Sequence, residues 1–523
     1  MSRIDRLALL VSLAAILAAA FVSLRIYEGL PHIEDEIAFT WQAKLIARGQ
    51  LTVPSPQPCP NCFLVPFVVD YNGQRFGKYP LGWPVVLALG EAFNARQIVN
   101  PLLAGLGVWL TYLLGKKLNG EGTGLLAALL TATSPFFLMN SGSLLSHPWS
   151  LVLSLAFSMA WLDAFTQPNP RLPARLARSL PTVTAGLCMA GLALTRPLTA
   201  VGVALPFGAH GLYLLLRADP ATRKRLLVFG LLAGSLALLH IAWQFAVTGN
   251  PLLNPYMLWW PYDTIGFGPG VGLQEGGYLL HDAWINGLFS LSIGASDLFG
   301  WPGLSWLFMP LGGYAIIRQQ HLRRSAGAWL AAAILPALVL IYTLYWIGSW
   351  LYGPRYYYEG LFSAAFLTAL GIQWLVGALP WRSSSGQQAL QFPWHGWQTL
   401  RYVLSSAFVV TLMACNLLFY IPARLGGMVG LYGVSRDCYR PFETAPARVA
   451  IPALVFVHGQ QWIEFGCMID MSSPFMDSDF VLAISLNPQI DAAIAAELPE
   501  RNVLHYYPET RRFISSRQEK PPQ

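Results

Sequence analysis

The sequence predicts an α-helical membrane protein with about eleven transmembrane helices and a small C-terminal α/β domain outside the cytoplasm. The chain has 523 residues, of which 54% are hydrophobic and 11% are charged, whereas a soluble domain has about 25% charged residues. Several apolar runs reach about 18 residues or more, enough for a helix to cross the roughly 30 Å hydrocarbon layer. The net charge is +7. In a membrane protein the placement of Lys and Arg reports the topology and says more than their sum, so no nucleic-acid partner is expected.

The first apolar run, Leu7 to Leu24, follows Arg3 and Arg6. It is longer than the apolar part of a typical signal peptide, so we expect a retained span with its N-terminus inside. Ten further spans are expected at residues 96–115, 122–140, 147–165, 182–195, 197–216, 226–248, 301–317, 326–345, 356–378 and 402–421.

Basic residues separate the two sides of the membrane in this prediction. The loop of residues 249–300 has no Lys or Arg but carries four acidic residues. By the positive-inside rule this loop lies outside the cytoplasm. Sixteen of the 33 Lys and Arg residues fall in the expected cytoplasmic pieces, namely Arg3, Arg6, Lys116, Lys117, Arg171, Arg175, Arg178, Arg217, Arg223, Lys224, Arg225, Arg318, Arg323, Arg324, Arg382 and Arg401.

Two domains follow from this topology. Residues 1–421 form the transmembrane domain, with extracytoplasmic loops at 27–95 and 249–300, and residues 422–523 form an extracytoplasmic domain. In the first loop we expect a helix at Ile37 to Ile46 that lies in the membrane interface with its apolar side toward lipid, and a juxtamembrane helix at Trp83 to Phe93. The C-terminal domain is expected to contain a parallel pair of strands, from strands at 453–457, 480–485 and 502–507 and a helix at 490–498.

Four of the six cysteines lie outside the cytoplasm in this topology, where disulfides are permitted. Cys59 and Cys62 are spaced as in redox or half-zinc sites, but no second pair of this kind exists. A structural disulfide or two free thiols are therefore both open for this pair, and the state of Cys438 and Cys467 is equally open.

Three consecutive carboxylates follow the first span directly, at Glu34, Asp35 and Glu36. An acidic cluster at a membrane surface is often merely solvated. Arg196 and Arg355 lie at outer ends of expected spans, where a charge near the apolar layer is costly and suggests function. The alternative is that these arginines only extend their charged heads to the interface.

These motifs resemble the GT-C glycosyltransferases, most closely the protein O-mannosyltransferases and the aminoarabinose transferase of lipid A. Over about residues 7–378, the similarity rests on Asp35-Glu36 followed by Gly49 and Pro54, on Lys78-Tyr79-Pro80 before a short apolar helix, on Leu194-Thr195-Arg196-Pro197, and on Tyr352-Gly353-Pro354-Arg355-Tyr356-Tyr357-Tyr358-Glu359. The resemblance is specific in the first loop and in the last motif, and weaker elsewhere.

The resemblance implies a transferase in the bacterial cytoplasmic membrane that moves a sugar from a polyprenyl-phosphate donor to a hydroxyl acceptor on a lipid, a glycan or a protein. It implies that Asp35 is the general base and that basic residues stabilise the departing phosphate. Inversion at the sugar carbon is then expected by analogy with base-assisted displacement. The candidate catalytic residues are Asp35 and Glu36, and the candidate donor-binding residues are Lys78, Arg196, Arg355, Tyr356 and His147.

Several alternatives remain open from the sequence. Glu36 could orient Asp35, hold a cation or bind the acceptor, and Glu34, Glu36 and His147 could form a weak divalent-metal site. His147 could equally be an interfacial residue behind a helix cap at Ser146. The chain could also be a transporter or flippase of lipid-linked sugars, although no matched halves are visible, or a non-catalytic protein of cell-envelope assembly.

Overall fold

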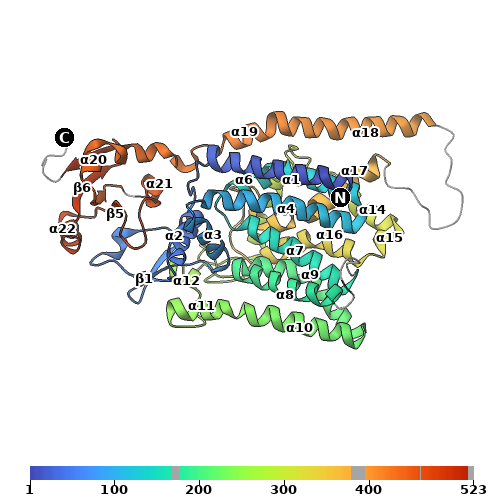
Figure 1. Ribbon diagram of the computed structural model, residues 1–523, viewed down its shortest axis with the longest axis horizontal. Coiled ribbons are helices and arrows are strands. Elements are labelled where there is room, and N and C mark those ends of the chain that lie inside the picture. The colour runs from blue at the N-terminus through green and yellow to red at the C-terminus, as the bar shows by residue number, and fades with distance from the viewer. Residues whose placement is uncertain (168–172, 174–175, 378–394, 460, 516–523) are drawn as a thin grey trace.

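A bundle of long helices carries a small α/β domain at one end in the computed structural model (Figure 1). The structure describes residues 1–523 except 168–172, 174–175, 378–394, 460 and 516–523. The N-terminus lies at the end of the bundle away from this domain. We call the end that carries the C-terminal domain the domain end.

The helices of the bundle run mostly parallel to one another (Figure 1). Their bounds are α1 Arg3–Phe21, α4 Arg96–Asn119, α5 Glu121–Ala132, α6 Pro135–Gly142, α7 His147–Phe165, α8 Leu176–Thr195, α9 Pro197–Arg217, α10 Pro220–Ala237, α11 Leu239–Thr248, α13 Leu280–Asp297, α14 Met309–Arg318, α15 Gln320–Arg323, α16 Ala326–Tyr342, α17 Leu361–Leu375, α18 His395–Cys415 and α19 Ile421–Gly426. The unit formed by α10 and α11 and the unit formed by α18 and α19 lie on opposite margins of the bundle.

Seven helices of the described residues are long and apolar enough to cross a membrane, or eight if the pair α5 and α6 counts as one span. That pair lies in the expected span 122–140 but is bent by 61°, at Pro135, which begins α6 after a Ser134 cap. The expected spans 301–317, 326–345 and 356–378 contain shorter helices. Residues 301–308 form turns before α14, and a 3₁₀ turn at Arg355–Gly360 precedes α17.

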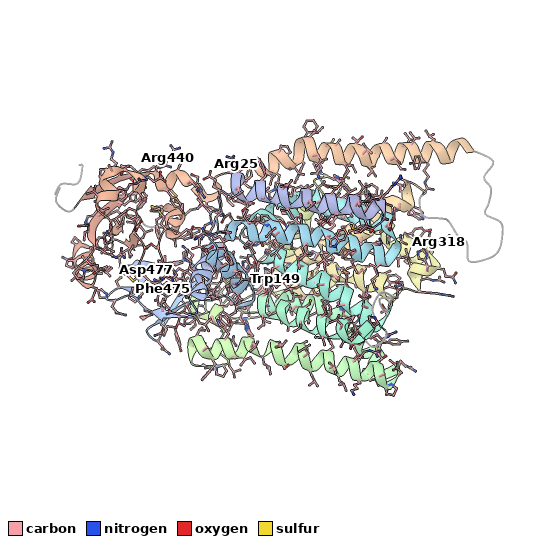
Figure 2. The ribbon with its side chains drawn as sticks, in the orientation of Figure 1. Arg25, Trp149, Arg318, Arg440, Phe475 and Asp477 are labelled. Carbon is pink, nitrogen blue, oxygen red and sulfur yellow. A yellow bond between two sulfur atoms is a disulfide. The ribbon has the colours of Figure 1, made fainter. Side chains whose placement is uncertain are left out.

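Some of the basic residues expected in the cytoplasm lie at the end of the bundle opposite the domain end. Lys116 near the end of α4 pairs with Asp5 near the start of α1, at 2.5 Å between Nζ and Oδ1. Arg318 also lies there (Figure 2). Three of the expected residues lie outside the described part of the chain, namely Arg171, Arg175 and Arg382.

The first loop folds into α2 Glu34–Ala47, α3 Gly82–Ala92 and a three-stranded antiparallel sheet. Its strands are β1 Val53–Pro54, β2 Val68–Tyr71 and β3 Gln74–Gly77, in the order β1-β3-β2. The expectation that the first helix turns an apolar side to lipid is wrong. Ile37 and Trp41 pack on the C-terminal domain and Phe39 packs into the bundle, because α2 carries apolar residues on more than one side.

The C-terminal domain contains a four-stranded sheet in the order β5-β4-β6-β7. Strands β4 Ala453–Val457, β5 Phe480–Ile484 and β6 Asn502–Tyr507 lie where the sequence predicted them. Strand β4 pairs in parallel with both β5 and β6, and α22 Pro488–Glu497 connects those two strands. Strand β7 Arg512–Ser515 adds an antiparallel edge that the sequence analysis did not predict. Short helices at α20 Ala445–Val449 and α21 Gly466–Ile469 complete the domain.

Both cysteine pairs that were expected outside the cytoplasm form disulfides, Cys59 with Cys62 and Cys438 with Cys467. Cys62 and Phe63 pack in a small core with Phe456 of β4 and Ile494 of α22. The first disulfide therefore belongs to the contact between the first loop and the C-terminal domain, which excludes the free-thiol interpretation for this pair.

A buried ion cluster fastens the C-terminal domain to the bundle. Asp470 follows α21 and pairs with Lys44 of α2 at 3.0 Å and with Arg96 of α4, whose Nη1 lies 2.8 Å from Oδ1. The Asp470 and Arg96 side chains are about one-tenth exposed. Burial would raise the pKa of Asp470, but Arg96 and Lys44 outweigh it and hold this pKa well below its ordinary value.

We predict that Asp470→Asn loosens this attachment, because Lys44 loses its carboxylate and Arg96 keeps only Glu91. Breaking a buried pair in this way costs about 3–5 kcal/mol. Thermal denaturation of the detergent-solubilised protein and limited proteolysis at the domain junction measure the effect. Because the pKa is lowered in the folded state, the contribution of Asp470 is present at neutral pH and is lost as the pH falls.

The matched control is Asp477→Asn. Asp477 pairs with Arg48 just beyond the end of α2, but both side chains are about half exposed, and exposed pairs contribute about 0–1 kcal/mol. Equal destabilisation by the two variants would contradict an anchoring role for Asp470.

Candidate active site

The candidate site lies at the N-terminus of α2, where Glu34, Asp35 and Glu36 begin the helix. Successive residues of an α-helix point about 100° apart. The three carboxylates therefore face three different partners, although they are neighbours in the sequence. Each of them has a different environment, and this difference separates their roles.

Asp35 faces the end of the first loop and the motif before α17. Its Oδ1 accepts a hydrogen bond from the Tyr79 hydroxyl at 2.5 Å, and its Oδ2 lies 3.3 Å from Nη2 of Arg355. The side chain is about one-quarter exposed. Burial would raise the pKa of Asp35, but Arg355 and the Tyr79 hydroxyl outweigh it, so this pKa lies below its ordinary value. Asp35 is therefore a largely ionised carboxylate that still reaches solvent.

Two stacked tyrosine rings, Tyr356 and Tyr342, connect Arg355 to Arg196. The guanidinium carbon of Arg355 lies 5.7 Å from the ring centre of Tyr356, and that ring stacks on Tyr342 at 5.0 Å. The Tyr342 hydroxyl accepts a hydrogen bond from Arg196 at 2.9 Å. Nη1 of Arg355 is buried and has no hydrogen-bond partner among the described residues, so it can donate to an anionic ligand.

Arg196 is held by the ends of several helices. Besides Tyr342 it contacts Thr199 at 3.0 Å, Nε2 of His147 at 3.3 Å and the Glu359 carboxylate at 3.5 Å. The structure therefore brings Arg196, His147 and Arg355 to one region at the domain end, as the sequence motifs predicted by their positions. Glu359 lies in the same motif as Arg355 but was not predicted as a site residue.

Lys78 lies in a cage of aromatic rings and not in open solvent. Its Nζ is 3.7 Å from the ring centre of Phe67, 4.8 Å from that of Tyr256 and 4.9 Å from that of Trp260. It pairs with Asp263 at 3.1 Å, and both side chains are almost fully buried. Burial lowers the pKa of Lys78, although Asp263 and Asp35 oppose this effect.

Asp263 connects Lys78 to the segment that leads to Arg355. Its Oδ1 accepts hydrogen bonds from the Tyr345 hydroxyl at 3.0 Å and from the Trp346 indole at 3.2 Å. In the sequence, Asp263 is one of the four acidic residues of the loop 249–300, and nothing there marks it as a site residue. The three donors that Asp263 accepts from are not visible in the sequence, because Lys78, Tyr345 and Trp346 lie 82 to 185 positions away from it.

Glu36 faces inward and is 1% exposed. Its Oε2 accepts from the backbone N–H groups of His32 and Ile33, and its Oε1 accepts from that of Leu144 at 2.7 Å. Burial raises the pKa of Glu36 to about 7, and these N–H groups oppose that rise. Glu36 therefore ties the start of α2 to the connection between α6 and α7.

The described residues contain no group of three or more His, Cys, Asp or Glu that could hold a metal ion. Both Glu36 oxygens accept backbone hydrogen bonds, and Nε2 of His147 faces the cationic Arg196. The weak metal site expected from Glu34, Glu36 and His147 is therefore not formed. Ser146 does not cap α7 with its side chain, so the capping interpretation also fails.

We predict that Glu36→Ala destabilises the protein by about 2–4 kcal/mol, because buried N–H groups lose their acceptor and each orphaned group costs about 1–3 kcal/mol. Glu36→Gln keeps one carbonyl oxygen and should recover part of this loss. The measurement is the thermal unfolding midpoint in detergent. Glu34→Gln is the control on the neighbouring, half-buried carboxylate, and an equally large loss there would contradict the assignment.

Comparison with known proteins identifies the architecture. Residues 86–194 match the family model of the N-terminal region of the oligosaccharyl transferase STT3. No curated protein matches the chain significantly.

Solved structures resemble the chain over nearly its whole length. ArnT of Cupriavidus metallidurans bound to undecaprenyl phosphate superposes with a TM-score of 0.54 at 15% identity, covering 95% of this chain and 89% of ArnT. The same protein in the apo state gives 0.56 at 13% identity, covering 96% and 93%. The oligosaccharyltransferase of Archaeoglobus fulgidus gives 0.51 at 13% identity, covering 94% and 69%. The chain therefore has the fold of the GT-C glycosyltransferases, a multi-pass membrane fold.

Proposed function

We propose that this protein is a glycosyltransferase that moves a sugar from a polyprenyl-phosphate donor to a hydroxyl acceptor on the outer face of the cytoplasmic membrane. The observation that carries this proposal is the contact between an ionised Asp35 and Arg355 at the domain end of the bundle. A base and a phosphate-binding cation then share one site. The similarity to ArnT with bound undecaprenyl phosphate supports the class of donor.

Asp35 has the properties of a general base in this reaction. It is ionised, reaches solvent and is fixed by the Tyr79 hydroxyl at 2.5 Å. The acceptor hydroxyl gives its proton to Asp35 as its oxygen attacks the anomeric carbon. The bond from that carbon to the phosphate oxygen breaks, and the polyprenyl phosphate leaves with the electron pair. A single displacement of this kind inverts the configuration of the sugar carbon.

The cations near the site are held by carboxylates. Lys78 pairs with Asp263, Arg355 with Asp35 and Arg196 with Glu359. The phosphodiester of the donor brings one negative charge, and the phosphate gains a second as the sugar leaves. The proton that Asp35 takes up in the same step removes negative charge beside Arg355, whose unpartnered Nη1 can donate to the departing phosphate.

The other candidate residues then have distinct parts. Tyr356 lies between the two arginines and holds their spacing, and Arg196 with His147 lines the side of the site formed by α7 and α9. Lys78 acts on the phosphate only through its charge and not by direct contact, because aromatic rings and Asp263 surround its ammonium group. Glu36 positions Asp35 by fixing the first turn of α2. A carrier of lipid-linked sugars would not need Asp35 as a base.

We predict that Asp35→Asn lowers the transfer rate by about 10²–10⁴-fold, the usual contribution of a general base, while donor binding is retained. The assay uses the purified full chain with a series of polyprenyl-phosphate sugars and follows both transfer and donor hydrolysis. Arg355→Ala is the contrasting variant and should weaken donor binding by about ten-fold or more, the loss of one hydrogen bond to a charged group.

Two results would refute these assignments. Full activity of Asp35→Asn would remove Asp35 from the mechanism. Unchanged donor affinity of Arg355→Ala would remove its contact with phosphate. A wild-type protein that neither transfers nor hydrolyses any donor of the series would refute the enzymatic proposal itself.

We also predict that Tyr79→Phe shifts the acid limb of the pH–rate profile upward. Asp35 acts when ionised, and its pKa lies below the ordinary value partly because of the Tyr79 hydroxyl. Losing that hydrogen bond raises this pKa, because the Tyr79 hydroxyl stabilises the ionised form of the carboxyl. Activity should then fail at a higher pH than in the wild type, whereas Phe67→Leu, which leaves the hydroxyl in place, should keep the acid limb unchanged.

A further inference from the structure

Glu359 is a buried carboxylate whose surroundings differ from those of Glu36. Both residues are 1% exposed. Glu36 accepts hydrogen bonds from three backbone N–H groups, whereas neither carboxylate oxygen of Glu359 has a hydrogen-bond partner among the described residues. A carboxylate that is buried without hydrogen bonds is costly. Glu359 therefore does not tie segments of the backbone together as Glu36 does, and its place in the structure has another reason.

The cation beside Glu359 is Arg196, whose Nε lies 3.5 Å from Oε1 of the carboxylate. The guanidinium of Arg196 already has three neutral partners. Its Nε donates to Thr199 at 3.0 Å and its Nη2 to Tyr342 at 2.9 Å. Its Nη1 donates to Nε2 of His147 at 3.3 Å, and this imidazole is neutral because a guanidinium group can only donate. These contacts hold the guanidinium in place, so Glu359 adds its negative charge and not a further hydrogen bond.

A charge beside Arg196 matters because the lipid phosphate changes its own charge during the proposed reaction. The donor phosphodiester carries one negative charge. The released polyprenyl phosphate is a monoester with a second pKa of about 6, so it carries nearly two charges at about pH 8. A guanidinium group has five N–H donors, and the three partners of Arg196 leave two of them for such an anion. Any positive charge at Arg196 that is not offset therefore favours the product over the donor.

We infer that Glu359 is a positioning residue that acts through Arg196 and limits how tightly the site holds the released polyprenyl phosphate, so that this product can leave. This inference rests on the proposed function. The Glu359 side chain is fully enclosed by protein, so it acts on the phosphate through charge and not through contact. It makes and breaks no bond and moves no proton in the reaction.

The test compares the affinities of the wild type and Glu359→Gln for polyprenyl phosphate and for an intact donor, by calorimetric titration of the full chain in detergent at about pH 8. The variant keeps the shape of the side chain and removes its charge. It should bind polyprenyl phosphate about ten-fold more tightly and the donor only about three-fold more tightly, because the change in free energy scales with the charge of the ligand. Glu359→Asp keeps the charge and should stay close to the wild type.

Kinetics give a second readout that a merely structural residue would not move in this direction. In Glu359→Gln the single-turnover rate of transfer should equal or exceed that of the wild type, because positive charge also stabilises the departing phosphate. The steady-state kcat should fall below this single-turnover rate, because release of the product becomes limiting. A variant with a damaged site would instead bind both ligands more weakly and lose single-turnover rate.

A double-mutant cycle shows whether Glu359 acts through Arg196. In an Arg196→Met background the buried carboxylate has lost its cation and takes up a proton, so adding Glu359→Gln should no longer tighten polyprenyl phosphate. The matched control is Asp297→Asn. Asp297 is a buried carboxylate at the end of α13 that pairs with Arg424 of α19 at 3.0 Å, away from the proposed donor contacts, and its loss should leave the affinity for polyprenyl phosphate unchanged.

The outcomes separate this inference from the proposed function. If the wild type neither transfers nor hydrolyses a donor but Glu359→Gln tightens polyprenyl phosphate as described, the proposed function fails and the charge effect of Glu359 stands. If donors are turned over but Glu359→Gln binds polyprenyl phosphate equally or more weakly, or tightens it equally without Arg196, the inference is overturned. Glu359→Met is a second neutral variant. If neither neutral variant folds even with polyprenyl phosphate present, Glu359 is a structural residue and the inference is also overturned.

Discussion

The burial of one short helix on several sides determines how this site is built. Helix α2 begins with three carboxylates, and no such group is buried cheaply unless a partner offsets the loss of water. Glu36 meets backbone N–H groups, Asp35 meets Arg355 and Tyr79, and Glu34 stays partly exposed. The two buried partnerships fix the first turn of α2 to the bundle and to the end of the first loop.

The same requirement explains why the cations near the site are already paired. An isolated ammonium or guanidinium group in this region would be costly, and Lys78, Arg196 and Arg355 each have a carboxylate within 3.5 Å. Pairing leaves the arginines oriented, and preorganised donors stabilise a developing charge without reorganising at the moment of reaction. The contacts that offset the cost of burying these charges are therefore the same contacts that the proposed reaction uses.

Local sequence patterns predicted the features that depend on neighbours in the chain. The long apolar runs gave α4, α7 and α9, and the alternation of strands and a helix gave β4, β5, α22 and β6 near their observed bounds. Three spans were drawn too long, since hydropathy does not register a turn such as the one at residues 301–308 or the 3₁₀ turn at Arg355–Gly360. Helix α2 was assigned to lipid because its apolar residues do not reveal whether protein or lipid covers them.

Contacts across long sequence distances were out of reach for this approach. Asp35, Lys78 and Arg355 could be named from motifs, and the structure brings Asp35 and Arg355 to 3.3 Å. The partners that give these residues their character could not be named. In the sequence, Tyr79 is only part of a motif and Asp263 is only an acidic residue of a loop. Tyr342 lies in an apolar span, and Glu359 ends a run of tyrosines. Only folding shows which charge each one balances.

The attachment of the C-terminal domain acts on the helix that carries Asp35. Lys44 near the end of α2 is held by Asp470, which also pairs with Arg96 of α4. Ile37, Trp41 and Leu45 lie along one face of α2 and are buried in a common core with the C-terminal domain. Because α2 is fixed along this whole face, a shift of the C-terminal domain would move the helix and the carboxylate of Asp35 with it.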